Sequence, residues 1–476
     1  MLFNSFQFLF FFLIVTTLYF ALPYKNRWLL LLISSCYFYM AFVPVYILIL
    51  AFTILIDYFA GIYIEKTEGK RRKLYLIFSL VANIGVLAFF KYYNFLDNNL
   101  SFLLHSFGLT NPIPYLSILL PIGLSFHTFQ AMSYTIEVYR GHQKAERHFG
   151  IYSLYVMFYP QLVAGPIERP QNLLHQFREK YNFDYDRIVE GLKLMLWGFV
   201  KKLVIADRLA IYVNAVYNNP QQHNGMTFLI ATIFFAIQIY CDFSGYSDIA
   251  IGAAKVMGFK LMTNFNRPYF AKNISEFWKR WHISLSTWFK DYLYISLGGN
   301  RVSVPRWYFN LLLVFIISGL WHGANWTYII WGALNGFYLV FAIITYKFRK
   351  KISTVLGINK LPNISQSLQI ITTFILTCFA WIFFRANNVT DAFDIIKKIS
   401  TFKGPVFIED PSMIIYPILA IFLLLFVELK QEYYKGDFSF LNNKNWILRN
   451  LSYTILIILI LLFGVFDGGQ FIYFQF

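Results

Sequence analysis

Two histidines are the residues of this sequence best suited to chemistry, because an imidazole can exchange a proton near neutral pH. His322 stands in segment 318–326, between the apolar runs 307–320 and 327–345, and His282 is the second candidate. Polar groups inside a membrane span are costly, charged ones by about 2.5–3.5 kcal/mol, so such residues are functional candidates by default. An imidazole beside an acyl thioester would accept the proton of an attacking hydroxyl. The alternative is a packed histidine bonded to a neighbouring helix.

Two aspartates, Asp242 and Asp248, interrupt the apolar segment 226–256, and we expect Gly245 between them to bend the helix. A spacing of six residues does not place two carboxylates on one helical face, so a paired acid/base dyad is not expected. Their simplest role is to pair with cationic side chains and brace a polar cavity. The candidate cations are Arg267, Lys279 and Arg280.

The elements that must position these groups are membrane helices. Of the 476 residues, 58% are hydrophobic and 21% aromatic, and apolar runs of roughly 17–25 residues, the length that crosses a bilayer, recur along the chain. The sequence predicts an all-α polytopic membrane protein of about ten to twelve transmembrane helices, with re-entrant and interfacial helices. The net charge of +17 indicates basic cytoplasmic loops rather than nucleic-acid binding. No metal-ligand spacing is present, and no metal is expected.

Basic loops predict the orientation of the chain. All six basic loops can lie in the cytoplasm only if an even number of membrane crossings separates each loop from the next. The apolar segments can be counted in a way that meets this condition. Both the N-terminus and the tail after the last span, 446–466, are then expected outside. The basic residues are Lys25 and Arg27; Lys66, Lys70, Arg71, Arg72 and Lys73; Arg140, Lys144 and Arg147; Arg301 and Arg306; Lys347, Arg349, Lys350 and Lys351; Lys430, Lys435 and Lys444.

The same parity leaves the middle of the chain irregular. The apolar segments 149–166, 189–206 and 226–256 must together supply an even number of crossings, so at least one is re-entrant, tilted or interfacial. Pro160 and Pro166 make the first a broken segment, which is tolerable where protein or a water-filled cavity satisfies the backbone. No internal repeat or long linker is visible, so we expect a single domain over 1–476 with an aromatic tail at 467–476.

Segment 274–297 carries an apolar stripe at steps of three and four residues, which predicts one amphipathic helix at or just inside the cytoplasmic interface. The stripe is Phe277, Trp281, Leu285, Trp288, Tyr292 and Ile295. Polar residues, among them Lys279, Arg280 and His282, occupy the other faces. The simpler interpretation is interfacial anchoring by aromatic and basic side chains.

Four motifs resemble those of the bacterial membrane-bound O-acyltransferase family, in the branch of alginate and peptidoglycan O-acetyltransferase membrane proteins. They are 162–166 (LVAGP), 240–248 (YCDFSGYSD), 276–288 (EFWKRWHISLSTW) and 320–325 (LWHGAN). The resemblance covers nearly the whole chain and is strongest from about 120 to 340.

The resemblance implies a helical fold around a funnel or tunnel in a bacterial cytoplasmic membrane. His322 matches the family's invariant histidine and His282 its second motif histidine. An acetyl donor reached from the cytoplasm is implied, acetyl-CoA as substrate with no bound cofactor, together with delivery to a cell-envelope polysaccharide. A periplasmic SGNH-type esterase/transferase is the implied partner, besides membrane lipid. The residues expected at the donor site or tunnel are Arg267, Lys279, Arg280, Asp242, Asp248 and Asn325.

The C-terminal tail, 471–476 (FIYFQF), follows Gly468 and Gly469. Its simplest role is interfacial anchoring. It is similar, however, to the aromatic-tyrosine motif of the small helper peptide in teichoic-acid D-alanylation, whose tyrosine is thought to carry the acyl group. The resemblance therefore implies that Tyr473 could enter the funnel from outside and present its hydroxyl to His322.

Two alternatives stay open from the sequence. The acyl group could be D-alanyl delivered by a carrier protein, for teichoic-acid-type polymers. The chain could instead be a lipid-linked glycan transporter, with His322 and the two aspartates as a proton relay; the absence of visible inverted repeats weighs against this.

Overall fold

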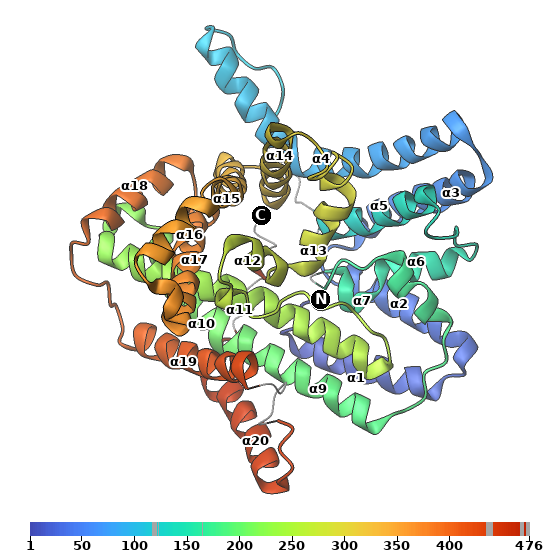
Figure 1. The fold of residues 1–476 in the computed structure, drawn as a ribbon. Coiled ribbons are helices and arrows are strands. Elements are labelled where there is room, and N and C mark those ends of the chain that lie inside the picture. The colour runs from blue at the N-terminus through green and yellow to red at the C-terminus, as the bar shows by residue number, and fades with distance from the viewer. Residues whose placement is uncertain (117–120, 122, 164, 435–440, 467–470, 473–476) are drawn as a thin grey trace. The chain divides into compact units, whose positions relative to one another are not determined.

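The computed structural model describes residues 1–476 except 117–120, 122, 164, 435–440, 467–470 and 473–476 (Figure 1). The described part is helical and contains no strand. The α-helices are α1 (Phe6–Ala21), α2 (Arg27–Met40), α3 (Ile47–Lys66), α4 (Gly69–Ser106), α5 (Leu124–Arg140), α6 (Phe149–Met157), α7 (Tyr159–Leu162), α8 (Pro170–Leu173), α9 (Tyr185–Phe199), α10 (Asp207–Tyr217), α11 (Gly225–Met257), α12 (Ile274–Arg280), α13 (Ile283–Trp288), α14 (Val304–His322), α15 (Trp326–Ile344), α16 (Tyr346–Val355), α17 (Pro362–Arg385), α18 (Val389–Thr401), α19 (Ser412–Tyr433) and α20 (Trp446–Phe463). Two π-helices are η4 (Val200–Ala206) and η7 (Phe289–Tyr294), and the 3-10 helices are η1 (Tyr24–Asn26), η2 (Pro44–Tyr46), η3 (His175–Arg178), η5 (Pro220–Gln222), η6 (Pro268–Phe270) and η8 (Ile358–Lys360).

The chain forms two compact units that alternate along the sequence. Unit 1 consists of Met1–Met195 and Tyr246–Met262, and unit 2 of Leu196–Gly245 and Thr263–Phe476. Two of the three boundaries fall inside α9 and α11, so each of these helices contributes to both units. A single domain over 1–476 with a tail at 467–476 remains a prediction.

Eight helices of the described residues are long and apolar enough to cross a membrane, which confirms the all-α polytopic class. They are η2 with α3, α4, α11, α14, α15, α17, α19 and α20. The prediction of ten to twelve spans is larger because it includes apolar segments that form shorter helices. One of these is α1, whose 16 residues extend about 24 Å, less than the roughly 30 Å hydrocarbon layer. The larger number therefore remains a prediction.

Unit 1 contains a buried polar cluster between α3, α4 and α5. One carboxylate oxygen of Asp57 accepts a hydrogen bond from the Ser79 hydroxyl at 2.6 Å, and the Asn83 amide donates to both oxygens at 2.9 Å. Ser79 in turn lies 3.0 Å from the Thr135 hydroxyl. These bonds compensate the cost of burying a polar side chain between helices.

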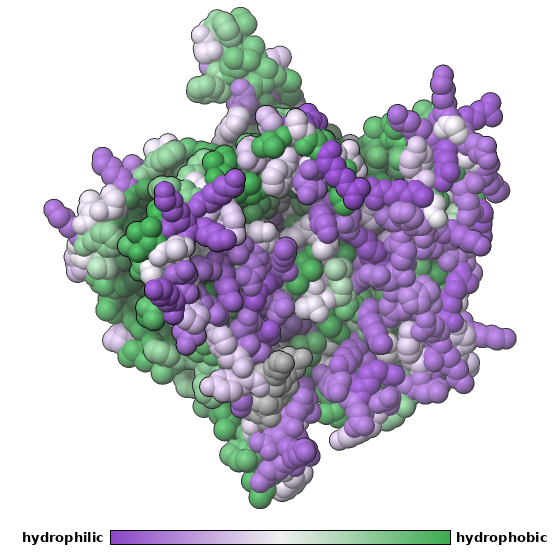
Figure 2. Space-filling view, viewed as in Figure 1, coloured by the Kyte–Doolittle hydropathy of each residue, from purple (hydrophilic) through white to green (hydrophobic). Residues whose placement is uncertain are grey.

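The C-terminal end of α4 carries exposed apolar side chains, which form the hydrophobic tip at the top of Figure 2. They include Phe102 and Leu103 of α4, and Phe107 and Leu109 directly after it are also exposed. Elsewhere on this face hydrophilic side chains predominate over the short helices and loops, whereas apolar ones gather along the long helices. The exposed apolar surface is what helices in contact with lipid require.

In unit 2, glycines let α14 and α15 approach closely. A Cβ added to Gly319 of α14 would lie 2.2 Å from the carbonyl oxygen of Tyr328, and one on Gly332 of α15 would lie 2.2 Å from that of Phe315. Any side chain there would force the helices apart. This contact sets the position of His322, which is the last residue of α14.

The predicted break in segment 149–166 is present. α6 ends at Met157, and Phe158 (φ −50°, ψ 111°) leaves the helical conformation before α7 begins at Tyr159. Pro160 is then the second residue of α7, where its missing N–H costs no helical hydrogen bond.

One sequence prediction about helix shape is wrong. Segment 274–297 is not one helix: α12 ends at Arg280, and α13 and η7 follow. His282 at the junction has φ +43°, because the backbone here bonds to a distant segment instead of continuing the helix. Gly245 lies within the continuous helix α11, and a Cβ there would lie 2.8 Å from the carbonyl oxygen of Gly198, so the glycine permits close packing. The expected bend at Gly245 remains a prediction.

Candidate functional site

His322 is buried among aromatic rings in unit 2. Its imidazole centroid lies 4.8 Å from Trp321, 5.0 Å from Trp331 and 5.4 Å from Phe384. These residues come from α14, α15 and α17, so three helices fix the ring. Edge-to-face contacts of this kind restrict an aromatic ring to one orientation.

His282 is the second buried histidine of this cluster. Its ring lies 6.3 Å from Trp321, whose other neighbour is His322, and 4.5 Å from Phe243 of α11. Both predicted histidines therefore contact the same tryptophan. Phe265 lies nearly parallel to the His282 ring, at 6.3 Å and 13°.

The left-handed backbone of His282 is held by pairing between two segments. Ile283 N donates to Asn264 O at 2.8 Å, and Asn266 N donates to Arg280 O at 2.9 Å. The buried side chain of Asn264 accepts from the Ser284 hydroxyl at 2.9 Å. These bonds offset the cost of positive φ in a non-glycine residue.

Asp242 pairs with a residue that the sequence interpretation missed. Lys202 Nζ lies 2.6 Å from Asp242 Oδ1 and 2.8 Å from Asp207 Oδ1, and the three side chains are buried. The expected pairing of Asp242 with Arg267, Lys279 or Arg280 is wrong, because Lys202 occupies that position and the two arginines pair with another carboxylate. Lys201 and Lys202, adjacent in an apolar segment, were the available signal.

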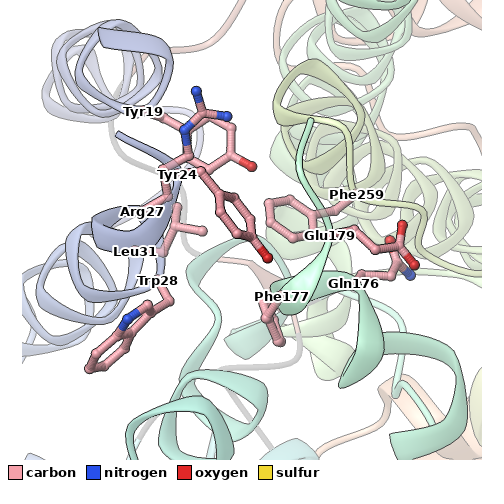
Figure 3. Close-up of a pocket in the computed structure, with 9 residues that line it drawn as sticks. All are labelled: Tyr19, Tyr24, Arg27, Trp28, Leu31, Gln176, Phe177, Glu179 and Phe259. Carbon is pink, nitrogen blue, oxygen red and sulfur yellow. The ribbon is translucent and has the colours of Figure 1, made fainter. Parts of the chain in front are cut away.

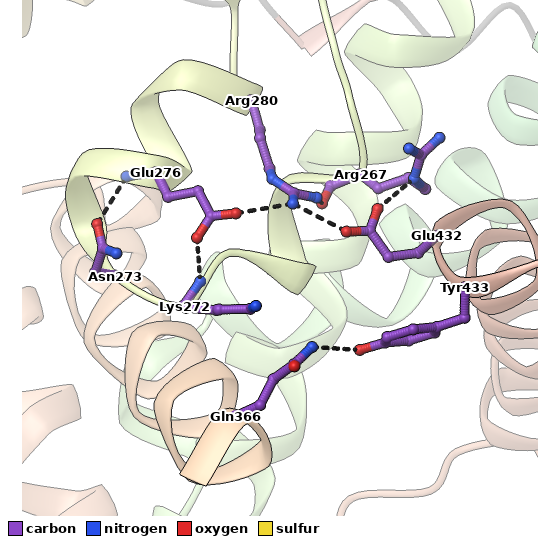
Figure 4. Close-up of polar contacts among 8 residues, drawn as sticks. All are labelled: Arg267, Lys272, Asn273, Glu276, Arg280, Gln366, Glu432 and Tyr433. Carbon is purple, nitrogen blue, oxygen red and sulfur yellow. Dashed lines mark hydrogen bonds and ion pairs between the residues drawn. The ribbon is translucent and has the colours of Figure 1, made fainter. Parts of the chain in front are cut away.

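Arg267 and Arg280 converge on Glu432, at the C-terminal end of α19 (Figure 4). Arg267 Nε lies 2.7 Å from Glu432 Oε2, and a terminal nitrogen of Arg280 lies 2.9 Å from Glu432 Oε1 and 2.8 Å from Glu276 Oε1. Two carboxylates therefore balance the two guanidinium charges. Lys279, the third predicted cation, is exposed.

Two further predicted residues lie elsewhere. Asn325 is the N-cap of α15: its side-chain oxygen accepts from Thr327 N at 3.1 Å, and its amide donates to Asn387 O at 3.2 Å. This is the usual role of asparagine at a helix start. Asp248 is half-buried and belongs to unit 1.

Tyr473 lies outside the described residues, but the two residues before it are buried in unit 2. Ile472 N donates a hydrogen bond to Asp242 Oδ2 at 2.7 Å. The ring of Phe471 lies 5.4 Å from Phe243, which also contacts His282. A series of ring contacts thus runs from the tail through Phe243, His282 and Trp321 to His322.

A small pocket in unit 1 is lined by Tyr19, Tyr24, Arg27, Trp28, Leu31, Gln176, Phe177, Glu179 and Phe259 (Figure 3). The Arg27 guanidinium covers the Tyr19 ring at 4.8 Å and donates to Tyr181 O at 2.6 Å. The cavity volume is about 10 Å³, close to the least that holds one water molecule. This pocket has no room for an acyl thioester.

Comparison with known proteins gives consistent matches. The sequence model described as MBOAT, membrane-bound O-acyltransferase family, matches residues 140–386. This range contains both histidines and every predicted site residue except Tyr473.

Curated relatives cover most of the chain. The probable alginate O-acetylase of Pseudomonas aeruginosa is 41% identical over 84% of this chain and 75% of its own length. The peptidoglycan O-acetyltransferase of Helicobacter pylori is 37% identical over 85% of this chain and 80% of its own length. The teichoic acid D-alanyltransferase of Bacillus subtilis is more distant, 28% identical over 56% and 69%.

Proposed function

We propose that this chain, which belongs to the membrane-bound O-acyltransferase family, is a transmembrane O-acetyltransferase. It is an acyltransferase and a multi-pass membrane protein. In this proposal it moves an acetyl group from cytoplasmic acetyl-CoA across a bacterial cytoplasmic membrane, for O-acetylation of an envelope polysaccharide of the peptidoglycan or alginate type. The relatives named for acetyl transfer, at about 40% identity, support acetyl as the acyl group and such a polysaccharide as the destination.

The observation that carries the proposed mechanism is the position of the tail beside the two histidines. Phe471 contacts Phe243, Phe243 contacts His282, and Trp321 contacts both His282 and His322. Ile472, which directly precedes Tyr473, is held in the same region. These contacts support the proposal that the tail supplies a phenol to this histidine cluster.

The chemistry follows from these groups. His322 accepts the phenolic proton of Tyr473 as its oxygen attacks the carbonyl carbon of the acetyl thioester. The O–C ester bond forms, the C–S bond breaks, and the proton passes from the imidazolium to the departing thiolate. The products are O-acetyl-Tyr473 and CoA, and His282 assists as a second base or positioning group.

The second transfer takes place outside the membrane. A periplasmic SGNH-type esterase/transferase takes the acetyl group from Tyr473, regenerates the phenol and esterifies a polysaccharide hydroxyl. This division means that only the acetyl group crosses the membrane, since the phosphates of acetyl-CoA are too polar to enter hydrocarbon. Lys279, which is exposed, is proposed to meet those phosphates together with Arg267 and Arg280.

The first test is acetylation of the purified full-length protein with isotopically labelled acetyl-CoA. Peptide mass spectrometry is expected to find the label on Tyr473 and to lose it in Tyr473→Phe, whereas Tyr434→Phe, an exposed tyrosine near the same end, keeps it. Full polysaccharide O-acetylation in cells carrying Tyr473→Phe would exclude the relay.

The second test removes the proposed base. His322→Ala is expected to lower acetyl transfer by about 10²–10⁴-fold, the range for loss of a general base, at normal expression. His175→Ala, at an exposed histidine, is the matched control. Unchanged O-acetylation in the His322 variant would refute its role.

The D-alanyl alternative is less supported, because the D-alanyltransferase relatives are more distant. The two donors are distinguished by supplying acetyl-CoA with no carrier protein. Acetylation of the protein under these conditions is expected only if acetyl-CoA is the donor. The transporter alternative is not carried forward, since the chain belongs to an acyltransferase family.

A further inference from the structure

Three buried charges lie together where η4 meets α10 and α11. Lys202 contacts both Asp242 and Asp207, and the side chains of Lys202 and Asp242 are only 1% and 3% exposed. Buried ions are costly unless they are paired and their remaining lone pairs accept hydrogen bonds. One cation faces two carboxylates here, so the cluster needs further donors.

The C-terminal tail supplies one of those donors. The backbone N–H of Ile472 donates to Asp242 Oδ2, the oxygen that does not face Lys202, at 2.7 Å. Ile472 and Phe471 are both buried, and Phe471 lies against Phe243, the residue that follows Asp242 in α11. A charged acceptor makes this hydrogen bond stronger than one between neutral groups.

The same elements also hold the chain after α20. Val465 N donates to Leu203 O at 3.1 Å, and Arg208 Nε donates to Phe463 O at 2.7 Å. η4 and the start of α10 therefore bind this part of the chain, while Asp242 binds Ile472. π-helical turns such as η4 occur frequently at functional sites.

We propose that the Lys202–Asp242–Asp207 cluster is a built docking site for the protein's own C-terminal tail, with Asp242 as the positioning residue. Lys202 fixes the carboxylate, the carboxylate holds the amide of Ile472, and this restricts where Tyr473, about 3.8 Å further along the backbone, can be placed. The inference rests on the proposed role of Tyr473 as acyl carrier and adds the group that seats it.

The competing interpretation is that the cluster only joins η4 to α11, whatever the tail does. Substitutions at Ile472 separate the two, because they leave all three charges in place. Ile472→Pro removes the N–H that Asp242 accepts, whereas Ile472→Ala keeps this N–H and shortens the side chain.

The initial rate of Tyr473 acetylation is measured in both variants of the full-length protein. Ile472→Pro is expected to be slower than Ile472→Ala by roughly tenfold or more, the effect of one hydrogen bond to a charged group. The acetyl-CoA concentration that gives half the maximal rate is expected to stay the same, because the donor does not contact the tail's amide. Equal rates in the two variants would overturn the proposal.

Asp242→Asn provides a second comparison. An asparagine that keeps its oxygen toward Lys202 presents its NH₂ to the Ile472 N–H, so two donors face each other. We expect a similar loss of rate, and no further loss when Ile472→Pro is added, because both changes remove one interaction. If the rate losses of the two substitutions add in the double variant, Asp242 and the Ile472 amide do not act through one hydrogen bond. If Asp242→Asn fails to fold, the comparison of Ile472→Pro with Ile472→Ala still tests the docking proposal.

Carboxypeptidase digestion tests the docking site without relying on any acetylation. Detergent-purified protein is digested, and removal of Ile472 and Phe471 is followed by intact mass. Removal is expected to be several-fold faster in Asp242→Asn than in the wild type or in Asp410→Asn, an exposed control. If digestion is faster in Asp242→Asn but wild-type Tyr473 is never acetylated, the docking site is retained and the acyl relay is refuted. If wild-type Tyr473 is acetylated but Asp242→Asn is digested at the wild-type rate, the docking site is refuted.

Discussion

The imidazole of His322 touches three aromatic rings contributed by three helices. At the residue scale this matters because a general base must hold its ring within hydrogen-bond reach of the proton it takes. Packing against rigid aromatic neighbours restricts the orientation of the His322 ring, and these neighbours carry no charge.

Burial also acts on Glu168, which lies between α7 and α8 and outside the candidate spans. Its carboxylate accepts hydrogen bonds from Met262 N and from Asn172 at 3.5 Å. Burial nevertheless raises the pKa of Glu168 from 4.5 to about 7, against the opposing effect of these bonds and of Arg169.

This shift predicts how stability changes with pH. Because the pKa is higher in the folded state, the stability that Glu168 contributes is complete below about pH 4.5 and is lost as pH rises through about 7. Glu168→Gln is expected to remove on the order of 1–3 kcal/mol of this pH dependence. Unfolding midpoints in detergent at pH 5 and pH 8 measure it, with exposed Glu179→Gln as control. An equal pH dependence in both variants would refute the assignment.

The residue types were sufficient to select the histidines but not to assign the charge pairs. His322 is selected because an imidazole in an apolar segment is costly, and His282 because an imidazole can exchange a proton near neutral pH. Asp242 and Lys202 are 40 positions apart, and Arg267 and Glu432 are 165 apart. Such partners are set by how helices pack, which local sequence patterns do not encode.

At the scale of elements, close packing of α14 against α15 positions the end of α14. Gly319 and Gly332 face one another across this contact. A Cβ added to either glycine would lie 3.2 Å from the Cα of the other. His322 follows Gly319 by three residues, so any separation of the two helices moves the imidazole.

Gly332→Ala is expected to destabilise the protein and lower acetyl transfer. Its Cβ would meet backbone at 2.2 Å, and overpacking a closed interface costs roughly 1–3 kcal/mol. Gly85→Ala in α4 is the matched control, because its Cβ meets nothing within 4 Å. Thermal unfolding and acetyl-transfer rate are compared for both variants. A Gly332 variant as stable and active as the Gly85 variant would show that the contact is not needed.

Hydropathy and periodicity predicted most of the helices but not their irregularities. The apolar stripe of segment 274–297 is largely buried as expected, with Phe277, Trp281 and Leu285 at most 3% exposed. The break at His282 was not predictable, because it depends on backbone bonds to residues 264–266. The π-helix η4 likewise had no recognised sequence signal.

At the scale of the whole molecule, the orientation in the membrane remains a prediction from the basic loops. A fluorescent protein fused after Phe476 is expected to be dark and an alkaline phosphatase fused there active, because both termini are predicted outside. Fusions after Lys351, in a predicted cytoplasmic loop, should give the opposite pair. A fluorescent C-terminal fusion would place Tyr473 on the cytoplasmic side and remove its access to an external partner.

The alternation of the two units has a consequence for biosynthesis. Unit 1 needs residues 246–262, yet the ribosome makes residues 196–245 of unit 2 first. Until Met262 has been made, Glu168 lacks the amide it accepts and Gly191 of α9 lacks its close contact with Gly252. The nascent first bundle must therefore persist in the membrane incomplete, so premature termination within residues 196–245 leaves neither half finished. Unit 1 can therefore close only after synthesis of unit 2 has begun, so the two units cannot be made strictly one after the other.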